Sequence, residues 1–551
     1  MPRRFAACVL ALVLSACGPK ADTVILGGIV WTGLSSGEAQ PGAVAIQGGK
    51  ILAAGDSASV AKYVGSRTQV IDARGGLVMP GFADGHNHFV DGGFQLGLLD
   101  LRDAATPQAF VQRIAQYAAK LQPGQWILGG DWDHTLWQGQ QLPRREWIDS
   151  VTPNTPVFIS RLDGHAALAN TAALAVAGVT KATPTPSGGE IQHDTRTGEP
   201  TGIVKDQAMD LIYAAVPAAT AEQMDSALAR AMVYAASLGL TATVHMSASW
   251  EHLASYRRLE NAGRLTLRAY LYFSLAGWRA VADSIANSSP GNAWIRIAGL
   301  KGFMDGSAGS RTAFFFDAYN DSAGYHGLQR NPEADMRTWI GNADSAGLQV
   351  AVHAIGDRAN ALLLAIYDSV ARAHGARDRR LRIEHAQHLR PEDIPRFGAL
   401  RIVPSMQPAH LIDDGRWVHQ RIGLERIKTT YAFRALLDSD APLGFGSDWS
   451  VATLDPLIGV STAVTRRTSD NKNPTGWVPA EKITLSEALR AYTAGNAWAV
   501  FAEQQWGTLA LGRDADVIVL DRNLFAMAPE SLATARVVVT IVGGKIVYRK
   551  S

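Results

Sequence analysis

The sequence predicts an α/β fold: a (β/α)₈ TIM barrel with a small β-sandwich domain built from both chain ends. Three observations support this prediction. Eight short apolar strands alternate with helical stretches in the middle of the chain, which favours a parallel sheet. The two ends share a different character, rich in β-branched residues and punctuated by glycine. Polar side chains recur where the apolar strands end, as expected when all strands open at one mouth.

The composition is that of a folded enzyme with a large core. The chain has 551 residues, of which 47% are hydrophobic and 19% charged, and these fractions are ordinary for globular proteins. The net charge is +2 and no run rich in Lys or Arg stands out. Nucleic acid is therefore not an expected partner.

The first 17 residues are predicted to be a lipoprotein signal peptide. Arg3 and Arg4 precede an apolar run, residues 5–14, which is too short to span a membrane as a helix. The following Leu-Ser-Ala-Cys, residues 14–17, resembles the lipobox of bacterial lipoproteins. The alternative is an ordinary signal peptide cut near Ala16.

Lipidation of Cys17 predicts a bacterial cell-envelope location. Acyl chains on Cys17 would anchor the protein without a membrane-spanning helix, so the membrane is a partner only through this lipid. Gly18 follows, and this fits an outer-membrane protein facing the periplasm better than an inner-membrane one. The only other cysteine, Cys8, lies in the removed peptide, so the mature chain would contain no disulfide.

The β-sandwich domain is expected to comprise residues 21–79 and 506–551. Strand-like segments with glycine turns occur in both parts. The sequence Gly-Gly-Lys-Ile occurs once in each part, at residues 48–51 and 543–546. We therefore expect one domain that encloses the middle of the chain.

Residues 80–505 are expected to form the barrel. The eight predicted strands are residues 80–89, 240–245, 267–273, 295–301, 348–353, 381–385, 401–405 and 443–448. Helical stretches such as residues 359–373 and 485–494 fit between or after them. An insertion, residues 100–235, follows the first strand, so we expect it to lie over the active-site face as a lid.

Two histidines at the end of the first barrel strand could bind a metal ion. Side chains two apart share one face of a strand, so His86 and His88 point the same way. Neutral imidazole nitrogen suits zinc and related ions. The motif alone is weak, because two surface histidines in a glycine-rich loop would look the same.

Four further polar residues end other predicted strands of the barrel. They are Lys301, His353, His385 and Asp448. Each alone is more often structural; Asp448, for example, could cap the next helix. Because the carboxyl ends of barrel strands converge on one mouth, all six groups could meet there. Their common placement predicts an active centre.

Several stretches together resemble the amidohydrolase superfamily, in the YtcJ-type branch that includes N-substituted formamide deformylase. They are residues 80–89, 301–312, 352–357, 383–387, 446–449 and 512–517. The resemblance covers nearly the whole mature chain. It implies a divalent metal centre, binuclear in many members, with Zn²⁺ the expected ion.

The resemblance also implies a role for each ligand. His86, His88 and Asp448 would hold the more buried ion, and His353 and His385 the second. Asp448 would also be catalytic, taking a proton from a metal-activated hydroxide nucleophile and delivering it to the leaving nitrogen. The expected reaction is hydrolysis of a non-peptide C–N bond in an amide, formamide or cyclic amide.

Lys301 would bridge the two ions as a carbamate formed with carbon dioxide. An unmodified ammonium offers only hydrogen-bond donors and cannot be a ligand, whereas a carbamate offers two anionic oxygens. The alternative is a plain lysine beside a one-metal site.

Two residues are candidate substrate ligands. His165, in the insertion, lies in Asp-Gly-His, which resembles a family stretch near the substrate. Arg311 could bind a substrate carboxylate or carbonyl, or could form a structural salt bridge. Weaker candidates near the mouth are His245, His388 and His410, and Trp132, Trp137 and Trp449 as an aromatic wall.

Two other functions remain open at this stage. One is a one-metal deaminase of a cyclic amidine, which Lys301 disfavours because such a site has no use for a bridging lysine. The other is a non-catalytic lipoprotein that binds a metal or solute, which Asp448 disfavours because binding alone requires no base. The sequence leaves open the specific substrate, the native metal and the oligomeric state.

Overall fold

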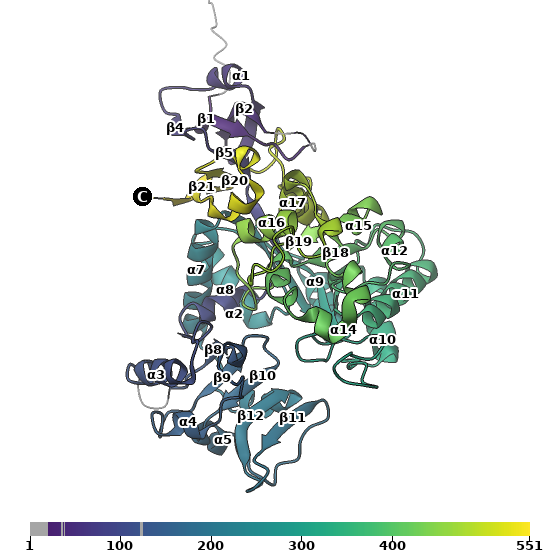
Figure 1. The fold of residues 1–551 in the computed structure, drawn as a ribbon. Coiled ribbons are helices and arrows are strands. Elements are labelled where there is room, and N and C mark those ends of the chain that lie inside the picture. Colours follow the sequence, from purple (N-terminus) through teal and green to yellow (C-terminus); the bar gives the residue numbers. More distant parts are fainter. Residues whose placement is uncertain (1–19, 35–36, 38, 122–124, 551) are drawn as a thin grey trace, which may run out of the picture.

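The computed structural model describes residues 20–34, 37, 39–121 and 125–550. The predicted signal peptide and Cys17 lie outside these residues. The strands of the described chain form three sheets, one near the chain ends, one in the middle and one in the insertion (Figure 1). In the same residues, none of the helices combines the length and apolar character needed to cross a membrane.

The middle sheet consists of eight parallel strands in sequence order. They are β6 (Phe82–Asn87), β13 (Leu240–His245), β14 (Arg268–Ser274), β15 (Ile295–Phe303), β16 (Gln349–Ala354), β17 (Arg382–His385), β18 (Val403–Met406) and β19 (Gly444–Phe445). These match the eight predicted strands and fit a TIM barrel. The barrel prediction is confirmed to that extent.

Hydrogen bonds join the first and last strands of this sheet. The Asn496 side chain donates to the carbonyl oxygens of Ala83 in β6 and Phe445 in β19, each at 2.7 Å. Just beyond β19, the backbone N–H of Asp448 donates to the carbonyl oxygen of His86 at 2.7 Å. The ends of β6 and β19 therefore lie together, and this closure brings Asp448 to the histidines of β6.

Helices cover the outside of the barrel, which explains why its strands are apolar on both faces. All six residues of β6, of β13 and of β16 are buried. The covering helices include α7 (Ala221–Ser237), α8 (Trp250–Asn261), α10 (Glu333–Ser345), α11 (Asp357–Ala373) and α16 (Pro456–Thr465). The helix predicted at residues 359–373 is α11. The one predicted at 485–494 is shorter, because α17 (Leu485–Ala491) ends before Thr493, whose backbone is non-helical.

Both chain ends contribute strands to one mixed sheet. Its strands are β1 (Thr23–Val30), β2 (Gln40–Gln47), β3 (Lys50–Gly55), β4 (Gln69–Asp72), β5 (Leu77–Pro80), β20 (Val517–Leu520), β21 (Val537–Val542) and β22 (Lys545–Arg549). The two ends meet where β5 pairs antiparallel with β20. Because hydrogen bonds join all eight strands into one sheet, the expected two-layer sandwich stays a prediction.

The repeated Gly-Gly-Lys-Ile sequences form equivalent hairpins in this sheet. Gly48 and Gly49 connect β2 to β3 with φ of 55° and 76°, and Gly543 and Gly544 connect β21 to β22 with φ of 53° and 78°. Two-residue loops with positive φ at both positions match the twist of the flanking strands and strongly favour glycine. The sequence similarity thus reflects one turn used twice.

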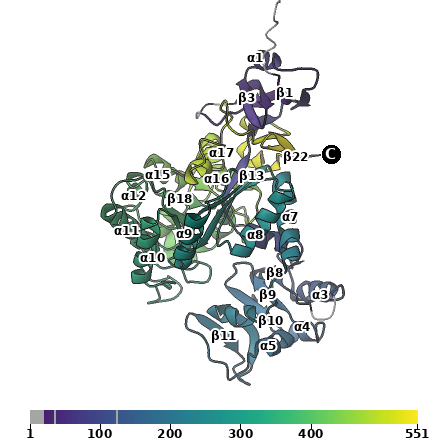
Figure 2. The same ribbon diagram turned by 180° about the vertical axis from the view of Figure 1, so that it is seen from behind.

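The insertion forms a separate six-stranded sheet. Its strands are β7 (Leu99–Asp100), β8 (Gly129–Trp132), β9 (Phe158–Arg161), β10 (Ala166–Ala169), β11 (Gly189–His193) and β12 (Pro200–Asp206), and its helices include α3 (Pro107–Ala118), α4 (Glu146–Asp149) and α5 (Thr171–Ala177). Figures 1 and 2 show this sheet on the opposite side of the barrel from the end sheet. Arg102 of the insertion donates to the carbonyl oxygens of Ser450 and Val451, which follow β19, each at 3.0 Å.

Candidate metal centre

His86 and His88 extend from the end of β6 toward one carboxylate. The Nε2 atoms of His86 and His88 lie 3.4 Å and 3.3 Å from Oδ1 of Asp448. One ligand atom from each of these three residues lies within 4.8 Å of the others. The shared strand face predicted for the two histidines therefore brings them to Asp448.

A buried network orients His86. Its Nδ1 lies 2.5 Å from Oε2 of Glu384, and Glu384 is bonded through Oε1 to Nε of Arg382 at 2.7 Å. Since Nδ1–H donates to a carboxylate, Nε2 of His86 carries the lone pair that a metal would need. Burial by itself raises the pKa of Glu384, but the charges of Arg382 and His86 hold that pKa well below its usual range.

Sequence analysis missed this network, although a signal was present. Arg382 and Glu384 alternate with apolar residues in β17, so both side chains point to the same face of a strand in the barrel. Charged residues are rarely fully buried unless they are paired. Two opposite charges two residues apart in an apolar strand indicate such a pair.

A second group of possible ligands lies around the other oxygen of Asp448. One ligand atom from each of His385, His410 and Asp448 lies within 4.8 Å of the others. Nε2 of His410 is 4.0 Å from Oδ2 of Asp448. Nδ1 of His385 and Nε2 of His410 are buried and have no hydrogen-bond partner among the described residues. Buried polar atoms normally have partners, and a bound ion would provide one here.

His410 is the strongest addition to the predicted ligands. Sequence analysis named it only as a weaker candidate near the mouth, and it lies four residues beyond the end of β18 rather than in the strand. A one-turn 3-10 helix, Pro408–His410, brings its imidazole back over the mouth, where its ring centre is 6.1 Å from that of His385.

His353 lies beside this second group. Its ring centre is 4.5 Å from that of His385. Its Nε2 lies 3.0 Å from the carbonyl oxygen of Gly306 and donates to it, which leaves the lone pair on Nδ1. Asp305, which sequence analysis did not single out, accepts hydrogen bonds from three backbone N–H groups at 2.8–2.9 Å, those of Phe314, Ile355 and Gly356. Asp305 thereby ties the loop after β15 to the end of β16.

Lys301 completes the set of six predicted ligands. It is buried, and its Nζ lies 3.3 Å from Nε2 of His86. Its ammonium also lies 5.0 Å from the ring centre of Phe303. Burial lowers the pKa of Lys301 to about 8. A lysine with this pKa supplies far more neutral amine near neutral pH than an exposed one does.

Two of the predicted ligands have unusual backbone conformations. Asp448 has a φ of 57° and His385 a φ of 74°. A left-handed backbone is uncommon outside glycine, and such residues cluster at functional sites where the surrounding structure holds them. Burial raises the pKa of Asp448, but the neighbouring histidines hold it well below its usual range.

The donor set fits a divalent metal ion. Burial holds the pKa values of His353 and His385 well below that of free histidine, so both imidazoles are neutral near neutral pH. Neutral imidazoles beside an ionised carboxylate are the ligands that Zn²⁺ prefers when cysteine is absent. The unpartnered nitrogens of His385 and His410 support the same conclusion.

The predicted substrate ligands lie outside this group of ligands. His165 is bonded through Nδ1 to Oδ1 of Asp206 at 2.8 Å. Burial lowers the pKa of His165, but the hydrogen bond to Asp206 and the charges of Asp163 and Asp206 together outweigh it, so the net pKa is raised. Arg311 forms an ion pair with Asp321, with Nη2 to Oδ2 at 3.0 Å. The salt-bridge alternative for Arg311 is therefore the one seen.

The weaker candidates other than His410 serve packing. His388 is bonded to Oγ1 of Thr430 at 2.8 Å, and His245 stacks on His252 with ring centres 4.9 Å apart. The indole N–H groups of Trp132 and Trp137 donate to backbone oxygens inside the insertion. Trp449 packs on α2 (Phe89–Gln95), where a Cβ on Gly92 would lie 2.5 Å from its ring. These tryptophans are core residues rather than a pocket wall.

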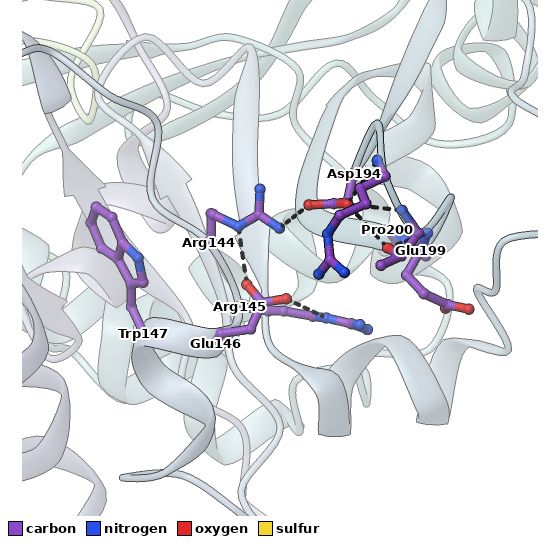
Figure 3. Close-up of a pocket in the computed structure, with 9 residues that line it drawn as sticks. Arg144, Arg145, Glu146, Trp147, Asp194, Glu199 and Pro200 are labelled. Carbon is purple, nitrogen blue, oxygen red and sulfur yellow. Dashed lines mark hydrogen bonds and ion pairs between the residues drawn. The ribbon is translucent and has the colours of Figure 1, made fainter.

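A pocket of about 390 Å³ in the insertion is separate from the metal centre (Figure 3). Four of its charged side chains pair with one another. Arg144 lies 2.8 Å from Asp194 and 3.2 Å from Glu146, and Arg145 lies 3.3 Å from Glu146. None of its lining residues is a predicted ligand, so this pocket carries no argument about the reaction.

The chain resembles three proteins over nearly its whole length. It is 38% identical to Protein LONG AFTER FAR-RED 3 of Arabidopsis thaliana, covering 96% of this chain and 92% of the relative. It is 31% identical to putative amidohydrolase YtcJ of Bacillus subtilis (95% and 99% covered) and 29% identical to N-substituted formamide deformylase of Arthrobacter pascens (92% and 95% covered).

A solved structure agrees with these relatives. An uncharacterized metal-dependent hydrolase from Pyrococcus horikoshii superposes with a TM-score of 0.75 at 29% identity, covering 92% of this chain and 98% of that one. The model of the Amidohydrolase family matches residues 69–548, which include both groups of ligands around Asp448. This chain therefore belongs to the amidohydrolase family.

Proposed function

We propose that this protein hydrolyses a non-peptide C–N bond of a small amide, formamide or cyclic amide. The observation that carries the proposal is the position of Asp448, whose two oxygens face the imidazoles of both groups of ligands. The relative named N-substituted formamide deformylase supports an amide-type substrate. Family membership supports metal dependence.

The roles of the protein's own groups follow from this arrangement. Bound divalent ions would supply a water of lowered pKa and polarise the substrate carbonyl. Asp448 accepts the proton of the attacking water and delivers it to the leaving nitrogen. Glu384 and Arg382 keep His86 in the tautomer that binds metal.

We also propose two Zn²⁺ ions and a carbamate on Lys301. The lowered pKa of Lys301 supports this, because only the neutral amine attacks carbon dioxide, losing a proton as the N–C bond forms. His86, His88 and Asp448 would hold one ion, and His353 and His385 the other. His410 is a further candidate ligand for the second ion, because it forms a group with His385 and Asp448. The carbamate would bridge the two ions with its two oxygens.

Metal analysis combined with an amide panel tests the proposal. Zinc per chain is measured for the parent protein and Lys301→Ala, and both are assayed for amine release from amides, formamides, cyclic imides and acylated amino acids. We expect about two ions in the parent, fewer in Lys301→Ala, and turnover only in the parent. One ion per chain in both the parent and Lys301→Ala, together with release of ammonia from ring amidines alone, would favour the one-metal deaminase. Metal bound without any turnover would favour a binding lipoprotein.

The envelope location is a separate proposal that rests on Cys17. In a Gram-negative host, we expect the chain to take up a labelled fatty acid and to fractionate with the outer membrane. Cys17→Ser should remove both properties. An unlabelled parent chain would contradict the proposed anchor.

A further inference from the structure

Arg330 is a cation that faces the metal centre without an ion-pair partner. Its guanidinium forms no hydrogen bond or ion pair with a side chain of the described residues, and it is exposed. Arg311, on the same segment after β15, is paired with Asp321. The two arginines therefore differ: Arg311 has a carboxylate partner, Asp321, which it shares with Arg421, whereas the guanidinium of Arg330 has none among the described residues and is free to bind an incoming anion.

The position of Arg330 is set by Phe303 at the end of β15. The guanidinium carbon of Arg330 lies 4.3 Å from the centre of the Phe303 ring. The backbone N–H of Arg330 donates to the carbonyl oxygen of Met304 at 2.8 Å. A guanidinium held over an aromatic face keeps its five N–H groups available as hydrogen-bond donors, since the ring contact uses none of them. The group is thus oriented but still able to bind.

Phe303 also contacts the metal centre, which brings Arg330 close to it. Nζ of Lys301 lies 5.0 Å from the same ring centre, and the His353 ring lies 5.5 Å from it. Besides burial, the charge of Arg330 contributes to the lowered pKa values of both Lys301 and His353. One aromatic ring therefore separates the free guanidinium from two predicted metal ligands.

Residues of the insertion lie near enough to Arg330 to interact with its charge. The charge of Arg330 contributes a lowering to the pKa of His165, and the charge of Asp206 contributes a raising to the pKa of Arg330. Asp206 does not neutralise Arg330, because its carboxylate is bonded to His165 at 2.8 Å and lies beyond ion-pair distance from the guanidinium. An anion between the barrel and the insertion would thus meet the guanidinium of Arg330 beside an imidazole of raised pKa.

We infer that Arg330 binds a carboxylate of the substrate, so that the favoured substrates are amides with a carboxylate a few bonds from the scissile C–N bond, such as N-acylated amino acids. This inference rests on the proposed amide hydrolysis and specifies its substrate class. A planar guanidinium binds a carboxylate through two parallel hydrogen bonds, which a neutral ester cannot reproduce.

The test compares acids with matched esters on the full-length, zinc-loaded enzyme. The L- and D-enantiomers of N-formyl and N-acetyl amino acids, and their methyl esters, are assayed by release of the amine. We expect the parent to favour the acids at least about tenfold in kcat/KM, and Arg330→Met to lower kcat/KM for the acids about 10- to 100-fold while the esters change less than about twofold. Arg330→Lys should fall between them. Equal losses for acids and esters, or no loss at all, would overturn the inference.

Arg311→Met is the matched control, since it removes an arginine of the same segment whose charge is already paired. We expect it to leave the acid-to-ester ratio within about twofold of the parent. Calorimetric binding of an N-acetyl amino acid separates this inference from the proposed function. If no amide is hydrolysed, the proposed function fails, while tenfold weaker binding by Arg330→Met than by the parent still supports the carboxylate site. Equal binding overturns it.

Discussion

The two halves of the metal centre are built in different ways. On the His86 side, hydrogen bonds link the side chains into a network: His86 bonds Glu384, Glu384 bonds Arg382, and Arg382 bonds Ser405 and the carbonyl oxygen of Gly85. Within this network, Nη1 of Arg382 is buried without a hydrogen-bond partner among the described residues. On the His385 side, the nitrogens Nδ1 of His385 and Nε2 of His410 are buried without a partner among the described residues. Asp448 is common to both halves.

This difference indicates what holds each half in place. The His86 half is organised by the fold itself, because protein–protein hydrogen bonds position His86, Glu384 and Arg382 whether or not a metal is present. The His385 half lacks such partners, so a bound ion is what would satisfy its nitrogens. We therefore expect substitutions in the first half to lower the stability of the metal-free protein, and substitutions in the second half to lower the metal content.

The largest expected effect comes from the residue that the two halves share. Asp448→Asn keeps the size of the side chain but removes the base, so kcat/KM for the best amide should fall about a thousandfold or more. Zinc content, measured by elemental analysis, should remain largely unchanged, because an amide oxygen can still contact the ions. Turnover near that of the parent would rule out Asp448 as the proton carrier.

The His86 half is tested with Glu384→Gln. This change leaves the buried charge of Arg382 unbalanced, and breaking a buried pair in this way typically costs about 3–5 kcal/mol of unfolding free energy. It also leaves one side-chain oxygen where two now serve His86 and Arg382, so His86 is held less firmly and zinc affinity should fall. Denaturant unfolding of metal-free protein measures the first effect.

Glu333→Gln is the matched control for that change. Glu333 forms an exposed pair with Arg337 within one helix, and such pairs contribute less than about 1 kcal/mol. The unfolding free energy should therefore barely change. If Glu384→Gln were equally mild, the proposed difference between the two halves would be wrong.

The smallest effect on stability is expected in the His385 half. His410→Asn removes a nitrogen that has no protein partner, so metal-free protein should lose less than about 1 kcal/mol of unfolding free energy. The zinc content should nevertheless fall toward one ion per chain. His388→Asn provides the opposite control: it breaks a buried hydrogen bond to Thr430 and should lower stability without changing zinc content. Retention of both ions by His410→Asn would exclude His410 as a ligand.

The periodicity of the chain was enough to predict the barrel strands and the residues at their ends. A strand places alternate residues on one face, and parallel barrel strands end at one mouth. The six residues grouped from this local pattern are His86, His88, Lys301, His353, His385 and Asp448. The two Gly-Gly turns could also be predicted from the sequence, because positive φ at two successive positions restricts the choice of residue to glycine and a few others.

His410 and Arg330 could not be found in this way. Both lie beyond strand ends, in segments whose course depends on packing: a short 3-10 turn returns His410 to the mouth, and contact with Phe303 directs Arg330 toward it. Arg311, the arginine predicted from the sequence as a substrate ligand, is instead paired with Asp321. That pairing likewise depends on how one long loop folds.

The sequence by itself determined which strands form and which side chains they present, since both follow from the local periodicity of the backbone. Tertiary structure alone decided which charges in the loop after β15 are neutralised. Arg311 is paired with Asp321 across that loop, and Arg330 has no side-chain ion-pair partner among the described residues. Electrostatic pairing depends on distances of a few ångströms between segments remote in sequence, and only packing sets those distances.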